Sequence, residues 1–246
     1  MDTMAVSGAR SQLDSFFMPK GCAIVGASRD PLKAGHQILR NLIDAGFVGG
    51  IYPVNPRETE ILGRKCYSSL AEIDGACELV VIATPASLIR AVIADISARM
   101  DQIGDIRAVI TAAAGFAETG APADKARQDD LMTCLRRYSI RELGPNCVGI
   151  IDNGNNLDTT FIMGTKRKKG GICFISQSGA LGAWLVESWS SQPEPAALGK
   201  FISLGNMADV DLIELLLYLG ADPDTRVIGM YVEGHRQARR LVEVSG

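Results

Sequence analysis

The sequence predicts an α/β fold built on mostly parallel sheets. Short apolar runs rich in β-branched residues recur between longer stretches of helical periodicity, which is the pattern of βαβ units. The run Leu79–Ala83 is apolar at every position, as central strands buried on both faces are. With 246 residues, 47% of them hydrophobic, the chain is long enough for one large or two modest domains.

The first unit, residues 1–153, is expected to alternate strands with helices. Its predicted strands are Cys22–Val25, Gly49–Tyr52, Leu79–Ala83, Ala108–Ala112, Ile140–Leu143 and Val148–Ile151. Its predicted helices are Gln37–Ala45, Leu88–Arg99 and Asp124–Tyr138. The polar, turn-rich stretch Asp152–Asn156 follows and favours a linker between two domains.

The second unit, residues 154–246, repeats the alternation. Its predicted strands are Gly171–Ile175, Lys200–Ser203 and Arg226–Tyr231, and its predicted helices are Ala180–Ser190, Val210–Leu219 and Gln237–Val244. Three strands are few for an independent doubly wound sheet. We therefore expect this domain to be incomplete at its C-terminus.

Composition excludes several classes of protein. A net charge of -3 with a single basic run, Lys166–Lys169, argues against a nucleic-acid partner, and that run fits a solvated linker. No stretch is long and apolar enough for a signal sequence or a membrane span, so we expect a soluble, cytoplasmic protein without a membrane partner. The six cysteines include no CxxC pair and only two histidines accompany them, which predicts reduced core thiols and no metal site.

The predicted strand ends carry the groups from which a ligand groove could form, because ligands of open parallel sheets bind beyond the carboxyl ends of the strands. These groups are small, proline-stiffened or amide-bearing: Gly26–Arg29, Pro53–Pro56, Thr84–Pro85, Ala113–Phe116 and Gly144–Cys147. They favour an extended ligand with a nucleotide head. The chain lacks GxGxxG, and Asn55 stands where NAD-binding proteins usually place an acidic residue. NAD is therefore the less favoured nucleotide.

A second candidate site is the turn that follows the strand Gly171–Ile175. The sequence Ser176-Gln177-Ser178-Gly179 opens a helix, where free backbone N–H groups and aligned peptide dipoles favour an anion. Small side chains leave a phosphate room to reach the backbone. Serine and glycine also serve simply as helix caps, and this alternative stays open.

Six short motifs, taken in order, resemble the NDP-forming acyl-CoA synthetases, the superfamily of ADP-forming acetyl-CoA synthetase and of the succinyl-CoA synthetase α subunit. They are Phe17–Lys20, Val25–Ser28, Tyr52–Pro56, Gly115–Glu118, Gly144–Gly149 and Ser176–Gly182. The resemblance covers nearly the whole chain. It implies a Rossmann-like CoA-binding domain followed by a flavodoxin-like succinyl-CoA-ligase domain.

The resemblance also implies functional residues. Those expected around coenzyme A are Gly26, Ser28, Arg29, Lys33, Val54, Asn55, Pro56, Thr84, Pro85, Ala112, Ala113, Ala114 and Asn146. Those expected around a phosphate are Ser176, Gln177, Ser178 and Gly179. Glu233 resembles the family's catalytic glutamate, which orients the histidine that accepts the phosphoryl group.

The implied activity is that of an acid–thiol ligase: carboxylic acid, CoA and ATP give acyl-CoA, ADP and phosphate through an acyl phosphate and a phosphohistidine. ATP, ADP and Mg would bind an ATP-grasp module in cis or in a partner subunit, within a homo- or hetero-oligomer. The family's acceptor histidine lies beyond the next strand, and this sequence ends at Gly246 before it. We therefore expect the chain to bind CoA and a small carboxylic acid or its acyl-CoA without turning over alone.

Neither histidine has a settled role in the sequence. His235 lies close to Glu233, but the helix start around it lacks the small residues of the family's acceptor segment, so we expect it to face solvent. His36 is either a helix-start polar residue or a contributor to the groove. Trp184 and Leu185 either line an acyl pocket or pack in the core.

Other functional classes stay open at this stage. A CoA-binding regulatory region like that fused to a protein lysine acetyltransferase would share the same motifs. An NAD(P)-binding Rossmann protein or a pure interaction module would differ in ligand binding.

Overall fold

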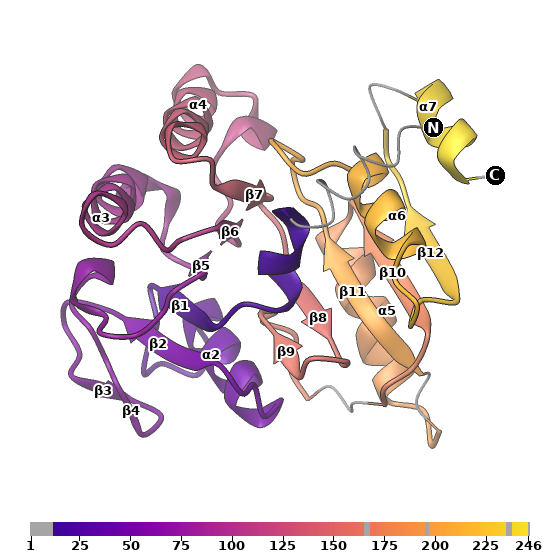
Figure 1. Cartoon of the computed structure of the whole chain (residues 1–246), viewed down its shortest axis with the longest axis horizontal. Helices are drawn as coiled ribbons and strands as arrows, with labels where there is room; N and C mark the ends of the chain where they lie inside the picture. The colour runs from indigo at the N-terminus through magenta and orange to yellow at the C-terminus, as the bar shows by residue number, and fades with distance from the viewer. Residues whose placement is uncertain (1–11, 165–167, 195–196, 235–237, 246) are drawn as a thin grey trace.

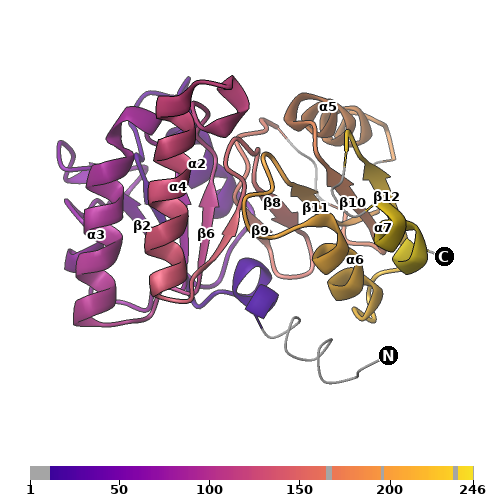
Figure 2. The ribbon, with the colours of Figure 1, turned by 90° about the horizontal axis from the view of Figure 1, so that it is seen from above.

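Two five-stranded sheets organise the chain, and helices flank both faces of each sheet (Figure 1). The structure is a computed structural model that describes residues 12–164, 168–194, 197–234 and 238–245. Seen from above, the two sheets and their helices lie side by side, with the helical turn over residues 12–17 between them (Figure 2). This arrangement confirms the predicted α/β class with two successive units.

The first sheet is entirely parallel, with strand order β2-β1-β5-β6-β7. Its strands are β1 (Gly21–Val25), β2 (Gly50–Val54), β5 (Leu79–Ile82), β6 (Ala108–Thr111) and β7 (Arg141–Leu143). Its helices are α2 (Ala34–Asp44), α3 (Ile89–Gln102) and α4 (Pro122–Arg137). A short hairpin, β3 (Glu60–Ile61) with β4 (Arg64–Lys65), follows β2, and single helical turns η1 (Leu70–Glu72), η2 (Ala86–Leu88) and η3 (Ala117–Thr119) join the other elements.

The apolar runs read from the sequence form the centre of this sheet. Every residue of β1, β5 and β6 is buried, because α2 covers one face while α3 and α4 cover the other (Figure 2). The start of α2 lies directly on the turn after β1. A Cβ atom at Gly35 would stand 2.1 Å from the Gly26 carbonyl oxygen, so this contact requires glycine.

The second sheet has strand order β12-β10-β11-β8-β9. Its strands are β8 (Ile150–Asp152), β9 (Leu157–Asp158), β10 (Ile172–Ser176), β11 (Leu198–Ser203) and β12 (Val227–Tyr231), and its helices are α5 (Gly179–Ser190), α6 (Leu212–Gly220) and α7 (Ala238–Ser245). Strand β10 pairs in parallel with β11 and β12, whereas β8 pairs antiparallel with both β11 and β9.

Two predictions about this region are wrong. The strand predicted at Val148–Ile151 does not close the first sheet, since β8 pairs with β11. The stretch Asp152–Asn156 is not a linker but the connection of the β8–β9 hairpin, so the second sheet has five strands rather than three. The division of the chain after residue 153 stays a prediction.

An apolar core continues across both units. The helical turn over residues 12–17 buries Leu13, Phe16 and Phe17 in a cluster that includes residues of both sheets. The Phe17 ring stacks on that of Tyr218 in α6, with centroids 4.9 Å apart, and the Tyr218 hydroxyl donates to Asp14. This segment therefore packs against the second unit while it leads into β1.

All six cysteines are buried and unbonded to one another, which confirms the prediction of reduced core thiols. Burial raises the pKa of the Cys147 and Cys22 thiols well above the usual range. Among the described residues, no helix is long and apolar enough to cross a membrane, and no cluster of metal-ligating side chains is present.

A buried arginine holds the segment between η1 and β5. Arg99 in α3 is 0% exposed, and its guanidinium donates to both oxygens of Asp105 at 2.7 Å and to the carbonyls of Leu70, Ile73 and Gly75. The planar fork satisfies one carboxylate and three carbonyls at once, which a lysine ammonium cannot do.

We expect Arg99→Lys to lower the free energy of unfolding by about 3–5 kcal/mol, because it leaves buried polar groups without partners. Urea unfolding followed by circular dichroism measures this change. The control is Arg90→Lys on the same helix, where the exposed pair with Asp130 at 3.8 Å predicts less than about 1 kcal/mol. Equal effects of the two substitutions would contradict the role given to Arg99.

Candidate functional site

A groove runs along the carboxyl edge of the first sheet. Its volume is about 1030 Å³. It lies over the ends of β1, β2, β5 and β6, as expected for a parallel sheet. The lining residues are Val25–Ser28, Lys33, Ala34, Val54–Arg57, Ser68, Ser69, Ala83–Pro85, Leu88, Ala91, Val92, Asp95, Ala113 and Ala114.

Ten of the thirteen residues predicted around coenzyme A line this groove. They are Gly26, Ser28, Lys33, Val54, Asn55, Pro56, Thr84, Pro85, Ala113 and Ala114. Arg29, Ala112 and Asn146 are not among the lining residues. The Arg29 guanidinium lies 2.7 Å from a Glu58 carboxylate oxygen and donates to the Glu60 carbonyl, so it is directed toward the β3–β4 hairpin.

A side-chain hydrogen bond connects the turns around the groove. Asn55 Nδ2 donates to the Ala27 carbonyl at 2.8 Å, while Asn55 Oδ1 accepts from the Arg57 backbone N–H. Gly26 adopts a φ of +92°, and a Cβ atom there would stand 2.9 Å from the Thr84 backbone nitrogen. The amide at position 55 thus ties the first two turns of the groove before any ligand arrives.

Thr84 lines the groove and has a hydroxyl group without a hydrogen-bond partner among the described residues. Its Oγ1 atom is buried. A buried hydroxyl without a partner is costly, so such atoms usually meet a ligand or an ordered water.

The sequence missed part of the lining, namely Arg57, Ser68, Ser69, Leu88, Ala91, Val92 and Asp95. Arg57 lies in the turn after β2, and the others come from η1, η2, α3 and the segments beside them. The two carboxylate oxygens of Asp95 share a bifurcated hydrogen bond from the Leu70 N–H, and burial raises the pKa of this carboxyl. The sequence feature that could have indicated this part of the lining is the serine pair Ser68–Ser69 directly before the helical turn η1.

The second predicted site lies at the start of α5, which confirms that the turn opens a helix. The Ser178 hydroxyl caps α5 by accepting from the Leu181 N–H, and Ser176 Oγ donates to the Ser178 carbonyl at 2.7 Å. No hydrogen bond between described residues uses the backbone N–H of Ser178, Gly179 or Ala180. Three backbone donors at the positive end of the helix are therefore unused by the described residues.

The Gln177 side chain holds the turn after β12 (Val227–Tyr231). Gln177 Oε1 accepts from the backbone N–H groups of Glu233 and Gly234, at 2.7 and 3.2 Å, while Nε2 donates to the Gly234 carbonyl. The structure therefore brings Glu233 beside the Ser176–Gly179 turn. The Glu233 side chain is exposed and pairs with no other described residue. His235 lies outside the described residues.

Main-chain hydrogen bonds join the two units along the free edge of β7. The backbone N–H groups of Asn206, Ala208 and Val210 donate to the carbonyls of Pro145, Gly144 and Glu142 at 2.8–3.1 Å. We call these two facing segments, residues 206–210 and 142–145, the seam.

Charged side chains reinforce the seam. Arg141 pairs with Asp209 and Glu214, each at 2.8 Å, and the Asp209 carboxylate also accepts from the Glu142 N–H. Asn206 Nδ2 donates to the Glu118 carboxylate at 2.6 Å, while the other Glu118 oxygen accepts from the Gly115 and Phe116 N–H groups. The loop after β6, which lines the end of the groove, is thereby fixed to the second unit.

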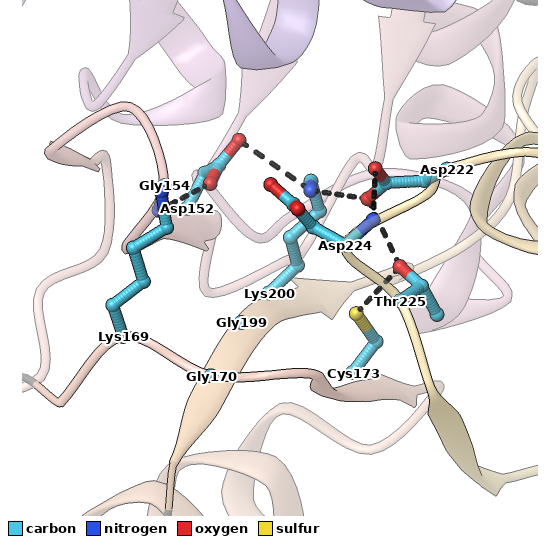
Figure 3. Close-up of a pocket in the computed structure, with 10 residues that line it drawn as sticks. All are labelled: Asp152, Gly154, Lys169, Gly170, Cys173, Gly199, Lys200, Asp222, Asp224 and Thr225. Carbon is cyan, nitrogen blue, oxygen red and sulfur yellow. Dashed lines mark hydrogen bonds and ion pairs between the residues drawn. The ribbon is translucent and has the colours of Figure 1, made fainter.

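A separate small hollow lies at the opposite edge of the second sheet (Figure 3). Lys200 Nζ lies 2.6 Å from Asp222 and 3.9 Å from Asp152, and the Cys173 thiol meets the Thr225 hydroxyl. Burial alone would lower the pKa of Lys200, but the hydrogen bond to Asp222 and the charge of Asp152 raise it. With a volume of about 10 Å³, the hollow holds at most a water molecule. The Lys200–Asp222 ion pair beside it therefore has a structural role.

Comparison with known families decides what the two units are. Residues 20–153 match the family model described as a CoA binding domain, and residues 169–245 match the succinyl-CoA ligase like flavodoxin domain. The chain belongs to the NDP-forming acyl-CoA synthetase superfamily. Its fold is accordingly a Rossmann-like CoA-binding domain followed by a flavodoxin-like ligase domain.

Individual members of the superfamily align along almost all of the chain. The acetate–CoA ligase [ADP-forming] II subunit alpha of Pyrococcus furiosus is 41% identical over 95% of this chain and 49% of its own length. The acetate–CoA ligase [ADP-forming] of Methanocaldococcus jannaschii is 34% identical over 95% of this chain and 31% of its own length. The chain thus spans half or less of these two relatives.

Solved structures agree. The dinucleotide forming acetyl-coenzyme A synthetase 1 of Ca. Korarchaeum cryptofilum, in complex with phosphate and ADP, superimposes with a TM-score of 0.85 and 34% identity, covering 95% of this chain and 48% of that one. The ATP citrate lyase of Methanothrix soehngenii, at 14% identity and a TM-score of 0.62, shares the fold alone.

Within this synthetase fold, the core interpretation of Trp184 is wrong. The Trp184 side chain on α5 is 62% exposed, whereas Leu185 beside it is half-buried.

Glu142 on β7 is a buried acid of the synthetase fold. It is 0% exposed, and neither carboxylate oxygen has a well-formed hydrogen bond to a described residue. Burial raises the pKa of Glu142 to about 8; the Thr111 hydroxyl opposes this rise and the Asp209 charge adds to it. The folded chain therefore keeps a proton that the unfolded chain loses near the ordinary pKa of 4.5.

We expect the free energy of unfolding to fall as the pH rises between about 4.5 and 8, since the folded state binds more protons across that window. Glu142→Gln removes this dependence. Its stability relative to the wild type should grow by about 1.4 kcal/mol per pH unit and level off above pH 8. Urea titrations at several pH values measure it, with the exposed Glu187→Gln as control. Parallel pH curves for wild type and Glu142→Gln would contradict the assignment.

Proposed function

We propose that this chain is the CoA-binding part of an ADP-forming acyl-CoA synthetase, which converts a carboxylic acid, CoA and ATP into acyl-CoA, ADP and phosphate. The observation that carries the proposal is the long groove of small residues at the carboxyl edge of the first sheet, within the matched CoA binding domain. The relatives named as ADP-forming acetate–CoA ligases support the reaction class.

The groove fits coenzyme A in size and chemistry. Its volume of about 1030 Å³ is at the upper end of ordinary ligand pockets, as an extended nucleotide-bearing molecule requires. Lys33 and Arg57 supply positive charge for phosphates, and the unpartnered Thr84 hydroxyl supplies a hydrogen-bonding group. The remaining wall consists mostly of small apolar side chains.

We infer an orientation of CoA within this groove. The nucleotide head lies between the turns at residues 26–33 and 54–57, Thr84 and Pro85 form the wall, and the pantetheine arm runs toward residues 112–114. Bound CoA would supply a thiol that accepts the acyl group. Arg29 and Asn146 stay in the proposed site only as residues at its margin, since neither lines the groove.

The turn at the start of α5 is the proposed phosphate site of the ligase domain. The free N–H groups of Ser178–Ala180 and the helix dipole offset negative charge without a metal. Gln177 lies in the same turn, and its side chain holds the backbone of Glu233. The Glu233 carboxylate would orient an acceptor histidine and fix its tautomer.

The histidine acceptor must come from outside the described residues. His36 is the only histidine within them, and both of its ring nitrogens already have hydrogen-bond partners. We therefore infer that turnover requires a further histidine-bearing segment and an ATP-grasp module that binds ATP and Mg. These would act in cis or as a partner subunit within an oligomer. The two functional units divide near residue 153, although β8 pairs with the second sheet.

Isothermal titration calorimetry of the chain with CoA and with NAD tests the ligand class. We expect saturable one-site binding of CoA and at least tenfold weaker binding of NAD, because no acidic residue stands at position 55 to bind the ribose of NAD. Tighter binding of NAD would favour an oxidoreductase-type Rossmann protein, and binding of neither would favour an interaction module. CoA binding without any turnover on addition of both the histidine-bearing segment and an ATP-grasp subunit would favour a regulatory region.

A variant that fills the groove tests its location. Ala114 is exposed and lines the groove, so Ala114→Trp should raise the dissociation constant for CoA more than tenfold while leaving the melting temperature within about 2 °C. The matched control is Ala126→Trp, on the exposed part of α4 away from the groove-lining residues. Unchanged CoA binding by Ala114→Trp would place the ligand elsewhere.

A further inference from the structure

His36 occupies a buried position beneath the first turn of the groove. It lies in the first turn of α2, is 4% exposed, and uses both ring nitrogens. Nδ1 lies 2.8 Å from the Ser28 carbonyl oxygen, and Nε2 lies 3.3 Å from Nη2 of Arg40. Neither ring nitrogen of His36 is therefore available to bind a ligand.

The neighbours of His36 decide which nitrogen carries the proton. A guanidinium only donates hydrogen bonds, so Nε2 must accept from Arg40. A carbonyl only accepts, so Nδ1 must carry its hydrogen and donate it to Ser28. The ring is therefore neutral, in a single tautomer, and acts as a fixed donor to one backbone carbonyl.

This donor sets the orientation of the peptide between Ser28 and Arg29. In a trans peptide the C=O and N–H point in opposite directions. Since the Ser28 carbonyl points at His36, the Arg29 N–H points away from α2. No hydrogen bond between described residues uses that N–H.

Other contacts fix the rest of the same turn and leave this peptide dependent on His36. The Ser28 hydroxyl oxygen accepts from the Asp30 N–H, Asp30 accepts from the Leu32 N–H, and Gln37 donates to the Pro31 carbonyl. Accepting from Asp30 leaves the Ser28 hydroxyl proton available to a ligand, next to the ammonium of Lys33 at the groove. Ser28 and Lys33 thus bring a hydroxyl and an ammonium to the groove, and the unused Arg29 N–H follows Ser28 directly in the chain.

We propose that His36 is a positioning residue, which locks the Ser28–Arg29 peptide so that the Arg29 N–H donates to a phosphate oxygen of CoA. This inference rests on the proposed CoA-binding function and adds a residue that does not itself touch the ligand. Without the lock, the peptide is free to rotate and turn a carbonyl oxygen, which repels phosphate, toward the groove. His36 therefore acts on affinity through the backbone.

Two near-isosteric substitutions separate this role from packing. In His36→Asn the amide nitrogen stands where Nδ1 stands, so the bond to Ser28 is kept and the contact with Arg40 is lost. In His36→Gln the amide reaches the place of Nε2, so the contact with Arg40 is kept and the bond to Ser28 is lost. Calorimetry with CoA and with dephospho-CoA, together with melting temperatures, compares both variants with the wild-type chain.

We expect His36→Gln to weaken CoA binding roughly tenfold, which corresponds to about 1.4 kcal/mol, and His36→Asn to stay within about threefold of the wild type. An equal loss in both variants would show a packing role only and overturn the proposal, as would wild-type affinity in His36→Gln. If His36→Gln loses affinity for CoA but not for dephospho-CoA, the Arg29 N–H is assigned to the 3′-phosphate. If His36→Gln loses affinity equally for the two ligands, the N–H is assigned to the pyrophosphate. Wild-type chain that binds no CoA would instead overturn the proposed function itself.

A measurement on the wild-type chain keeps the test independent of how well the variants fold. On titration with CoA, the Arg29 amide should show one of the largest chemical-shift changes in ¹⁵N–¹H correlation spectra. A saturating CoA titration that leaves the Arg29 amide unmoved would overturn the proposal while leaving the CoA-binding function intact.

Discussion

The seam between residues 206–210 and 142–145 is the constraint on which the rest of the molecule depends. Strand β7 lies at the edge of the first sheet, and its exposed backbone groups would otherwise remain open to another strand. The loop after β11 donates one main-chain hydrogen bond to Glu142 of β7 and two to Gly144 and Pro145 just beyond it, and Arg141 pairs with Asp209 and Glu214 of the second unit. Main-chain hydrogen bonds and ion pairs thus act together to fix the relative position of the two units.

This fixed geometry links the two candidate sites. Glu118 holds the loop that ends the groove through the Gly115 and Phe116 N–H groups, and through Asn206 it holds the ligase domain as well. In the second unit, Gln177 Oε1 accepts from the Glu233 and Gly234 N–H groups and so holds Glu233 near the start of α5. Each site is thus preorganised by side chains whose polar atoms are already used, while the donors left free among the described residues include backbone N–H groups and the Thr84 hydroxyl.

The sequence predicted the strands whose burial is complete, but it missed the two-residue strands and assigned β8 to the wrong sheet. Runs such as Leu79–Ile82 have no polar position and no alternative to a central strand. The strand predicted at Val148–Ile151 overlaps β8, but its pairing with β11 in the other sheet is not encoded in its own residues. β9 has only two residues and ends on the buried acid Asp158, so it carries no strand signal. The strand-end rule likewise found the groove but missed Asp95 and Ser68, which reach it from outside the strands. Which residues are ligands and which are braces, as with Gln177 and His36, depends on hydrogen bonds that spacing does not encode.

The crystal structure of this chain with CoA tests most directly the claim that the groove of the first sheet is the CoA site and leads toward the seam. The account predicts the nucleotide head between the turns at residues 26–33 and 54–57, a phosphate oxygen on the Arg29 N–H, and the thiol end beside Ala113 and Ala114, with the seam unchanged. A CoA molecule bound elsewhere, or one whose thiol points away from residues 112–114, would contradict it.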